Sequence, residues 1–104
     1  MYCGADFSVC DPSESEIYAF NFVNDLTPGD TLASAVWTCT VSQGVDANPS
    51  ARLSGAASVY ESTYTTQRII GGVAGVSYIL MATATTAQGN TLVLWSHSRV
   101  EVIN

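Results

Sequence analysis

The chain has 104 residues, nine acidic side chains, three arginines and no lysine, and its formal net charge is −6 at pH 7. This length suits a single domain, taken as residues 1–104 with residues 1–12 as a candidate N-terminal arm. With no basic stripe and no long apolar run, the composition argues against nucleic-acid binding and against a membrane span.

The first residues, Met1 to Asp6, lack the basic start and apolar run of a signal peptide, so we do not expect secretion by that route. The three cysteines form an odd set without metal-ligand spacing, which predicts neither a zinc site nor a disulfide framework. Cys39 lies in an apolar strand and is expected in the core. A bridge between Cys3 and Cys10 stays open.

An alternating aromatic run predicts the first long strand, over residues 16–23. One face of this strand is expected to be buried, and it would contain Tyr18, Phe20 and Phe22. Residues 25–30 then form a turn, because Pro28 fixes its own φ and Gly29 supplies a positive φ.

A second long strand is predicted over residues 31–42. Trp37 is expected at the centre of the core, because a strand tryptophan packed on the opposite sheet fills the middle of a small sandwich. Residues 44–50 form a loop, and shorter strands are predicted at 51–53 and 57–61.

The last third of the chain gives the clearest strand pattern. A strand over residues 63–70 ends in a glycine-rich corner, 71–75, and a hairpin of strands 76–86 and 91–102 follows. Tyr78 comes just after the corner, where immunoglobulin-like domains place a tyrosine whose hydroxyl bonds the backbone a few residues upstream.

Helical periodicity is nearly absent from the sequence, and Thr, Val, Ser, Tyr and Gly dominate between the turn signals. About seven antiparallel strands, with a turn roughly every eight to twelve residues, predict an all-β fold of the immunoglobulin-like β-sandwich type. A jelly roll is the alternative fold.

Catalysis would depend on His97, the one histidine of the chain. Its neighbours Ser96 and Ser98 are adjacent strand residues, so they point to the opposite face and cannot present a hydroxyl to the imidazole. We therefore predict no enzyme activity and no cofactor.

Two groups of acids raise the question of a calcium site. Asp11, Glu14 and Glu16 precede the first long strand, and Asp25 and Asp30 flank the Pro-Gly turn. Their spacing matches no calcium-binding loop. We expect solvated acids and turn-capping aspartates, and no metal site.

Aromatic side chains that remain after the core is filled are the expected contacts to partner proteins. The predicted contact residues are Tyr60, Tyr64, Trp95, His97 and Arg99. A core position for Trp95 stays open. The predicted edge strands contain few charges, which suggests that something covers them.

Short motifs run along nearly the whole chain. The first half has Asp11-Pro12, the alternating aromatic strand, Gly29-Asp30-Thr31 and the strand from Ser34 to Trp37; the second half has Gly71-Gly72-Val73-Ala74-Gly75, then Tyr78 and Leu80, then Gly89-Asn90-Thr91. In this combination the chain resembles small virion proteins of tailed bacteriophages, and in particular the phage fiber-tail adaptor family.

The resemblance implies a non-catalytic structural domain of the virion, repeated in a symmetric assembly and put together inside the infected bacterium. Its partners would be other virion proteins of the tail, neck, fibre or capsid. We expect an adaptor that joins a tail fibre to the tail or neck. The alternatives are a capsid decoration protein that clamps shell subunits and, from a different class, a carbohydrate-binding β-sandwich.

Overall fold

The computed structural model describes residues 2–3, 7 and 9–102. These residues form two three-stranded antiparallel sheets, with strand orders β1-β4-β3 and β2-β5-β6. The elements are β1 (Ser15–Asn21), β2 (Leu32–Gln43), the 3-10 helix η1 (Pro49–Arg52), β3 (Leu53–Tyr60), β4 (Tyr64–Ile70), β5 (Ser77–Thr86) and β6 (Thr91–Arg99).

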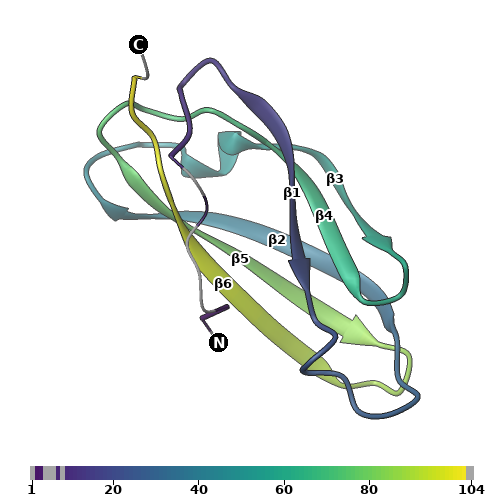
Figure 1. Ribbon diagram of the computed structural model, residues 1–104. Coiled ribbons are helices and arrows are strands. Elements are labelled where there is room, and N and C mark those ends of the chain that lie inside the picture. The colour runs from purple at the N-terminus through teal and green to yellow at the C-terminus, as the bar shows by residue number, and fades with distance from the viewer. Residues whose placement is uncertain (1, 4–6, 8, 103–104) are drawn as a thin grey trace.

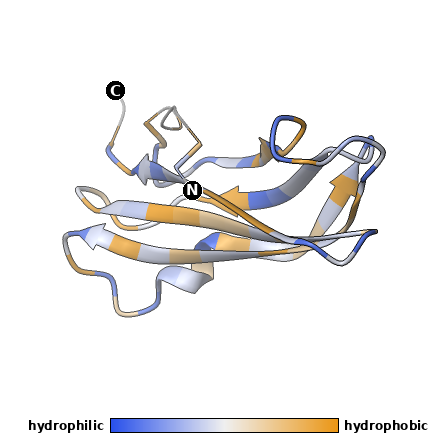
Figure 2. Cartoon of the chain, turned by 90° about the horizontal axis from the view of Figure 1, so that it is seen from below, coloured by the Kyte–Doolittle hydropathy of each residue, from blue (hydrophilic) through white to orange (hydrophobic). Residues whose placement is uncertain are grey.

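The two sheets face each other as the layers of a sandwich (Figure 1; Figure 2). If the six strands are taken as strands B to G, they follow the immunoglobulin-like order, in which B, E and D form one sheet and C, F and G the other. The predicted all-β sandwich is therefore confirmed.

The described residues contain six regular strands where the sequence predicts about seven. The short strands predicted at 51–53 and 57–61 are a single strand, β3, preceded by η1. Gly55 has a φ of 75°, and the β3–β4 register shifts between Ser54 and Ser58. The glycine therefore makes a bulge, which bends the strand without ending it.

A segment near the N-terminus runs parallel to β6 along its outer edge. We call its described part, residues 2–3, 7 and 9–10, the N-terminal segment; the rest of the candidate arm up to residue 8 lies outside the described residues. The backbone N–H groups of Cys3, Phe7 and Cys10 donate to the carbonyls of Trp95, His97 and Arg99 at 2.9, 3.1 and 2.9 Å. The edge of β6 is therefore covered by the chain itself.

Alternation of side chains fills the space between the sheets, and hydrophobic and hydrophilic residues alternate along the strands in Figure 2. The buried faces are those that the sequence predicts, and they include Phe20, Phe22, Trp37, Cys39, Tyr78, Leu80, Ala82 and Ala84. Trp37 spans the core, because its indole Nε1 donates to Thr65 Oγ1 of the opposite sheet at 3.0 Å.

None of the three cysteines is in a disulfide, so the open question of a Cys3 to Cys10 bridge is answered in the negative. Cys39 is a core residue, as predicted. Burial raises the pKa of its thiol to about 11, although nearby Arg52 acts in the opposite direction.

Asp30 joins the β1–β2 turn to the β5–β6 turn at one end of the sandwich. Burial acts to raise the pKa of its carboxyl group, but the hydrogen bonds that it accepts outweigh burial and lower the pKa. The donors are Thr86, the backbone N–H groups of Thr31 and Gln88, and the side chain of Asn90.

Tyr78 organises the other end, at the glycine-rich corner. Its hydroxyl accepts from the N–H of Val73 at 2.9 Å, which confirms the predicted corner tyrosine, and donates to Asp46 Oδ2 at 2.6 Å. This hydrogen bond, followed by that from the N–H of Asn48, lowers the pKa of Asp46. A Cβ at Gly72 would lie 2.5 Å from the Tyr78 hydroxyl, so no larger residue fits there.

Arg52 is buried beside this corner, with only 1% of its surface exposed. Its Nη1 donates to Ser98 Oγ and its Nε to the carbonyl of Ile70, both at 3.0 Å. The guanidinium also lies over the ring of Tyr78, 4.6 Å from the ring centroid. One cation thus connects η1 with the last residue of β4, with β5 and with β6.

Replacing Tyr78 by Phe removes the hydroxyl that joins Val73 to Asp46 and leaves the ring in place. The partly exposed N–H of Val73 and the carboxylate of Asp46 then lose a partner that water replaces only in part, so we expect the free energy of unfolding to fall by about 1–2 kcal/mol. Urea unfolding measures the change, with Tyr64→Phe on the outer face as the control, expected within about 0.5 kcal/mol of the unmodified chain. Equal losses in both variants would contradict this role of the corner.

The lowered pKa values of Asp46 and Asp30 predict a loss of stability in acid. Both carboxyl groups bind protons more weakly in the folded state, so their contribution is present above the ordinary value of 3.8 and is lost as the pH falls through the folded-state values. We expect the free energy of unfolding, measured with urea, to fall between about pH 6 and about pH 2. In Asp46→Asn the fall should be smaller. In the exposed control Glu61→Gln this fall should be as large as in the unmodified chain. An equally large fall in Asp46→Asn would contradict the role of Asp46.

Candidate partner-binding surfaces

The five predicted contact residues lie on the two opposite outer faces of the sandwich. Trp95, His97 and Arg99 alternate along β6 with buried residues, so they lie on the outer face of the β2-β5-β6 sheet. Tyr60 and Tyr64 lie on the outer face of the β1-β4-β3 sheet. We call these surfaces the Trp95 face and the Tyr60 face. The structure therefore forms two groups rather than one site.

Trp95 is an outer-face residue that its neighbours half cover, so the alternative of a core position is excluded. The ring of Tyr2 lies 4.9 Å from the Trp95 ring, and His97 packs edge-on against it at 5.4 Å. Across the sheet, Met81 is paired with Trp95 and Ile79 with His97. Aromatic and aliphatic side chains thus adjoin one another on this face.

Arg99 lies at the end of the same strand with its charge already paired. Its Nε lies 2.6 Å from Glu101 Oε1, and its Nη1 donates to Ser77 Oγ at 3.0 Å. Because this ion pair is exposed, it adds little to stability and reduces the attraction of Arg99 for an acidic partner.

The Tyr60 face has two tyrosines at the tip of the β3–β4 hairpin (Figure 1). Tyr60 and Tyr64 are cross-strand partners, and their ring centroids are 6.4 Å apart. The turn between them has positive φ values at Glu61 and Ser62, 51° and 64°. Tyr60 is 59% exposed, which leaves its ring available for contact.

The serines beside His97 point into the sandwich, as alternation predicts. Ser96 and Ser98 are fully buried, and the hydroxyl of Ser98 accepts from Arg52. His97 is on the opposite side of the strand, so neither hydroxyl forms a serine-histidine pair with it.

The acids near the first strand cap a turn. Ser13 N–H donates to Asp11 Oδ1 at 2.9 Å, and Asp11 N–H donates to Glu14 Oε1 at 2.8 Å. Asp11 and Asp30 are therefore turn-capping aspartates, as predicted. Among the described residues, no group of three or more His, Cys, Asp or Glu side chains is placed to hold a metal ion. In the same part of the chain, no helix has the length and apolar character that a membrane crossing requires.

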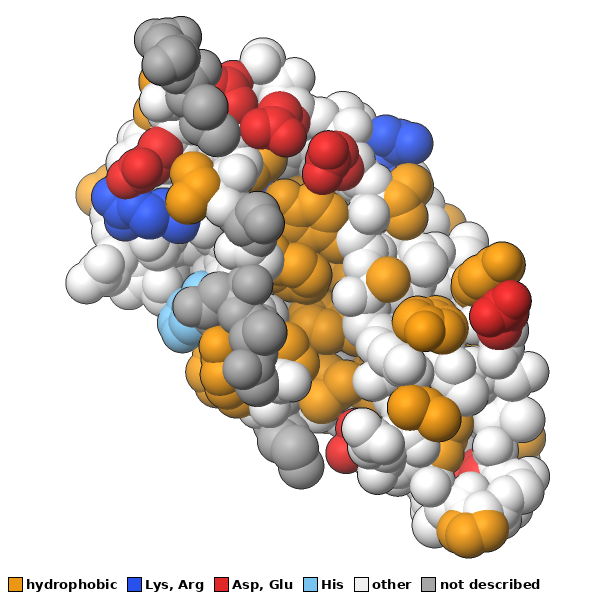
Figure 3. All heavy atoms as spheres, in the orientation of Figure 1, with side chains coloured by type: hydrophobic (Ala, Val, Ile, Leu, Met, Phe, Trp, Pro, Cys, Tyr) orange, Lys and Arg blue, Asp and Glu red, His pale blue; other side chains and the backbone are white. Residues whose placement is uncertain are grey.

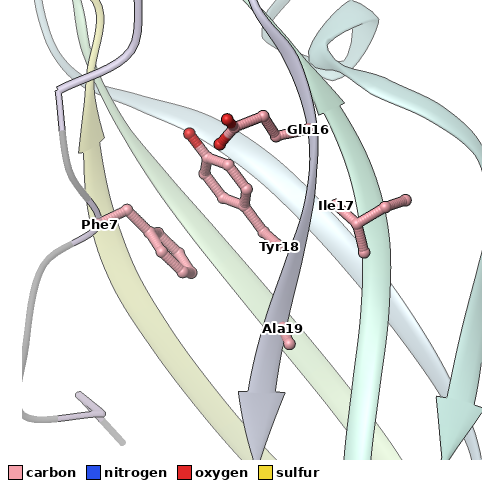
Figure 4. Close-up of a pocket in the computed structure, with 5 residues that line it drawn as sticks. All are labelled: Phe7, Glu16, Ile17, Tyr18 and Ala19. Atoms are coloured by element: carbon pink, nitrogen blue, oxygen red, sulfur yellow. The ribbon is translucent and has the colours of Figure 1, made fainter.

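A hollow of about 260 Å³ lies beside β1, facing the N-terminal segment. Figure 3 shows hydrophobic side chains gathered in a stripe between this segment and β1. The lining residues are Phe7, Glu16, Ile17, Tyr18 and Ala19 (Figure 4). The sequence does not reveal this hollow, because alternation places Ile17 and Ala19 opposite the aromatic row but does not show that β1 is an edge strand.

Tyr18 and Phe7 form the aromatic part of this hollow. Their ring centroids are 4.6 Å apart, and in Figure 4 Ile17 points to the other side of the strand. Burial, followed by Cys10 and to a smaller degree the Glu16 carboxylate, raises the pKa of Tyr18 to about 12. The hydroxyl of Tyr18 is therefore neutral at ordinary pH, and Glu16 is the charged group of the hollow.

A second hollow, of about 340 Å³, lies between the edge strands β2 and β3. No charged side chain contributes to its lining, which consists of Ala35, Val36, Trp37, Leu53, Gly55, Ala56, Ala57 and Gln67.

In a comparison with known protein families, residues 11–94 match the family described as Podophage GP4 fiber-tail adaptor protein gp77. The matched range contains β1 to β5 and the beginning of β6. No curated protein matches the chain.

Substituting the two tryptophans separately tests their different environments. Trp37→Phe removes buried volume and the hydrogen bond to Thr65, so we expect a loss of about 2–4 kcal/mol in the free energy of unfolding. Trp95→Phe changes a half-exposed ring and should lose about 1 kcal/mol or less. Urea unfolding of the two variants gives the comparison, and a larger loss for Trp95→Phe would place that residue in the core instead.

Proposed function

We propose that this chain, which belongs to the podophage GP4 fiber-tail adaptor protein family, joins a tail fibre to the tail or neck of the virion. The family is a structural one and not a class of enzymes, so the function to be explained is binding. We further propose that several copies follow the symmetry of the tail and are assembled in the cytoplasm of the infected bacterium.

The observation that supports this function is the placement of the predicted contact residues on opposite faces. An adaptor has to hold two partners at once. The Tyr60 face and the Trp95 face belong to different sheets, which pack about 10 Å apart in a sandwich. Two partners can therefore bind from opposite sides without contacting each other.

The composition of the two faces suits protein contacts. Tyrosine and tryptophan are enriched among the residues that dominate binding energy. Only about one residue in eight is charged, so a partner can cover much of the surface without burying a charge that has no partner. Several copies in one assembly would also make weak individual contacts sufficient.

Reconstitution with purified tail and fibre components tests the proposal. The unmodified chain should form a three-component complex that sediments as one species, and each component should bind without the other. The double substitution Tyr60→Ser and Tyr64→Ser should weaken binding of one component by about tenfold or more, and Trp95→Ser with His97→Ser should weaken binding of the other. Val45→Ser, at an apolar loop residue that is 84% exposed, is the matched control and should leave both affinities unchanged.

Electron cryo-microscopy of the particle supplies the decisive outcome. Density for the chain at the junction of fibre and tail, in a copy number set by tail symmetry, supports the adaptor function. Density across the head shell would replace it with capsid decoration. If the chain binds neither component and instead binds glycans, the adaptor function is wrong.

A further inference from the structure

Three of the four sheet edges are covered, bulged or set beside a strand of the other sheet. The N-terminal segment is hydrogen-bonded along β6. The register of β3 shifts between Ser54 and Ser58. β2 shifts only near its ends and pairs evenly with β5 from Ser34 to Val41, but its edge adjoins β3 of the other sheet. Covering segments and bulges are the means by which natural proteins prevent edge strands from pairing with other chains.

The fourth edge, β1, has neither kind of protection in the described part of the chain. Its pairing with β4 runs from Ser15 to Asn21 without a register shift, and no described segment pairs with its other side. A regular edge strand of this kind can accept a further strand.

At Ile17 and Ala19 the backbone of β1 presents hydrogen-bonding groups that no described segment pairs with. The carbonyl of Glu14 accepts, and the N–H of Phe22 donates, a hydrogen bond of 2.8 Å with a residue that flanks β4. Between these two bonds the register of β1 and β4 is continuous. Even-numbered residues therefore bond β4, and odd-numbered residues turn their N–H and C=O groups away from it. Ile17 and Ala19 are both exposed.

The ends of the strand limit the length of this free edge. Arg68 Nη1 donates to the Ser15 carbonyl at 3.4 Å, and the side chain of Asn21 accepts the N–H of Val23 at 3.0 Å. The Ser15 carbonyl and the Val23 N–H are therefore already bonded, and Ile17 and Ala19 form the centre of the available edge.

The hollow beside this edge indicates which side chain an added strand would place there. The rings of Phe7 and Tyr18 provide apolar and aromatic surface, and Glu16 provides the charge. Among the described residues Glu16 has no ion-pair partner, since the one pair found there joins Arg99 to Glu101. A lysine or arginine matches this hollow, because its stem packs on the rings and its cationic end reaches the carboxylate.

We propose that β1 is the docking edge for an extended, lysine- or arginine-bearing segment of another virion protein. The segment adds to the sheet beside β1, bonds Ile17 and Ala19, and places its cationic side chain against Glu16. This inference rests on the proposed adaptor function, because it states how one partner is held.

A second copy of the chain does not suit this edge. The chain has no lysine, and its net charge of −6 makes two copies repel. Each arginine is already engaged: Arg52 is buried, Arg68 donates to Ser15 Oγ at 3.0 Å, and Arg99 is paired with Glu101. A cation from a different protein therefore suits this hollow better than an arginine of a second copy.

Amide NMR of the ¹⁵N-labelled chain tests the edge with defined probes. The probes are two short peptides in which Thr and Val alternate around a central residue, Lys in one and Glu in the other. We expect the Lys peptide to shift the amide signals of Ile17 and Ala19 and to slow their hydrogen exchange, with at least about fivefold higher affinity than the Glu peptide. Glu16→Lys should reverse the preference, and the exposed control Glu61→Lys should keep it. The edge assignment is overturned if neither peptide moves these signals, or if the shifts map to β2 or β3. It is also overturned if adding unlabelled chain produces the same shifts, because a second copy would then be the partner.

The capture of tail and fibre components separates this inference from the function on which it rests. Ile17→Pro removes an outward-facing donor at a strand edge that accommodates proline, and Glu16→Lys reverses the charge of the hollow. Both should lose one component, whereas Glu61→Lys should keep both. If the unmodified chain and the edge variants bind both components equally, the adaptor function stands and the edge assignment is wrong. If the unmodified chain binds neither, the function is overturned, and with it the assignment of this partner.

Discussion

One buried cation, Arg52 packed over the ring of Tyr78, fixes the end of the sandwich at which distant segments of the chain meet. Its guanidinium bonds Ser98 of β6 and the last carbonyl of β4, while the Tyr78 hydroxyl reaches the β2–β3 loop through Asp46. A charge taken out of water is strongly unfavourable unless such contacts replace its hydration. An arrangement that separated these segments would leave the cation without the partners of its Nε and Nη1, and so this end of the sandwich favours the observed one.

The use of an arginine inside the sandwich has a consequence for the surface. The chain has three arginines and no lysine, so few cations remain to prevent the sheet edges from pairing with other chains. Edge lysines usually have this role. The protection comes from the backbone instead, through the segment that covers β6 and the bulges of β2 and β3. β1 lacks both, and its single charged side chain within the strand, Glu16, is an acid that attracts a basic partner.

Sequence patterns predicted those features that depend on local geometry. The alternation of side chains gave the buried faces of β1, β2 and β5, and the glycine-rich corner gave the role of Tyr78. They did not predict the path of the N-terminal segment, the identity of the edge strands or the continuity of β3 through Gly55. Those features depend on pairing between segments far apart in the chain, which no local pattern contains.

The orientation of β6 shows why hydrophobicity alone was ambiguous for Trp95. Trp95 is far more apolar than its neighbour Ser96, yet the serines of the strand are buried and the tryptophan faces outward. The inner face of β6 has to place Leu94 and Val100 in the core and the hydroxyl of Ser98 beside Arg52. Because strand residues alternate, this requirement turns Trp95 and His97 to the outer face.

The same chain of causes connects the interior to the proposed function. The inward-facing residues Leu94, Ser98 and Val100 set the rotation of β6 about its own axis, and that rotation decides which side chains lie on the outer face. The Tyr60 face belongs to the other sheet, and Trp37 joins the two sheets by its hydrogen bond to Thr65. Close-packed interiors transmit strain and resist compression, so two partners bound to opposite faces would be held at a fixed spacing and angle. A small sandwich is suited to an adaptor for this reason: the rigidity that orders its core also defines the geometry between the Tyr60 face and the Trp95 face, the two proposed contact surfaces.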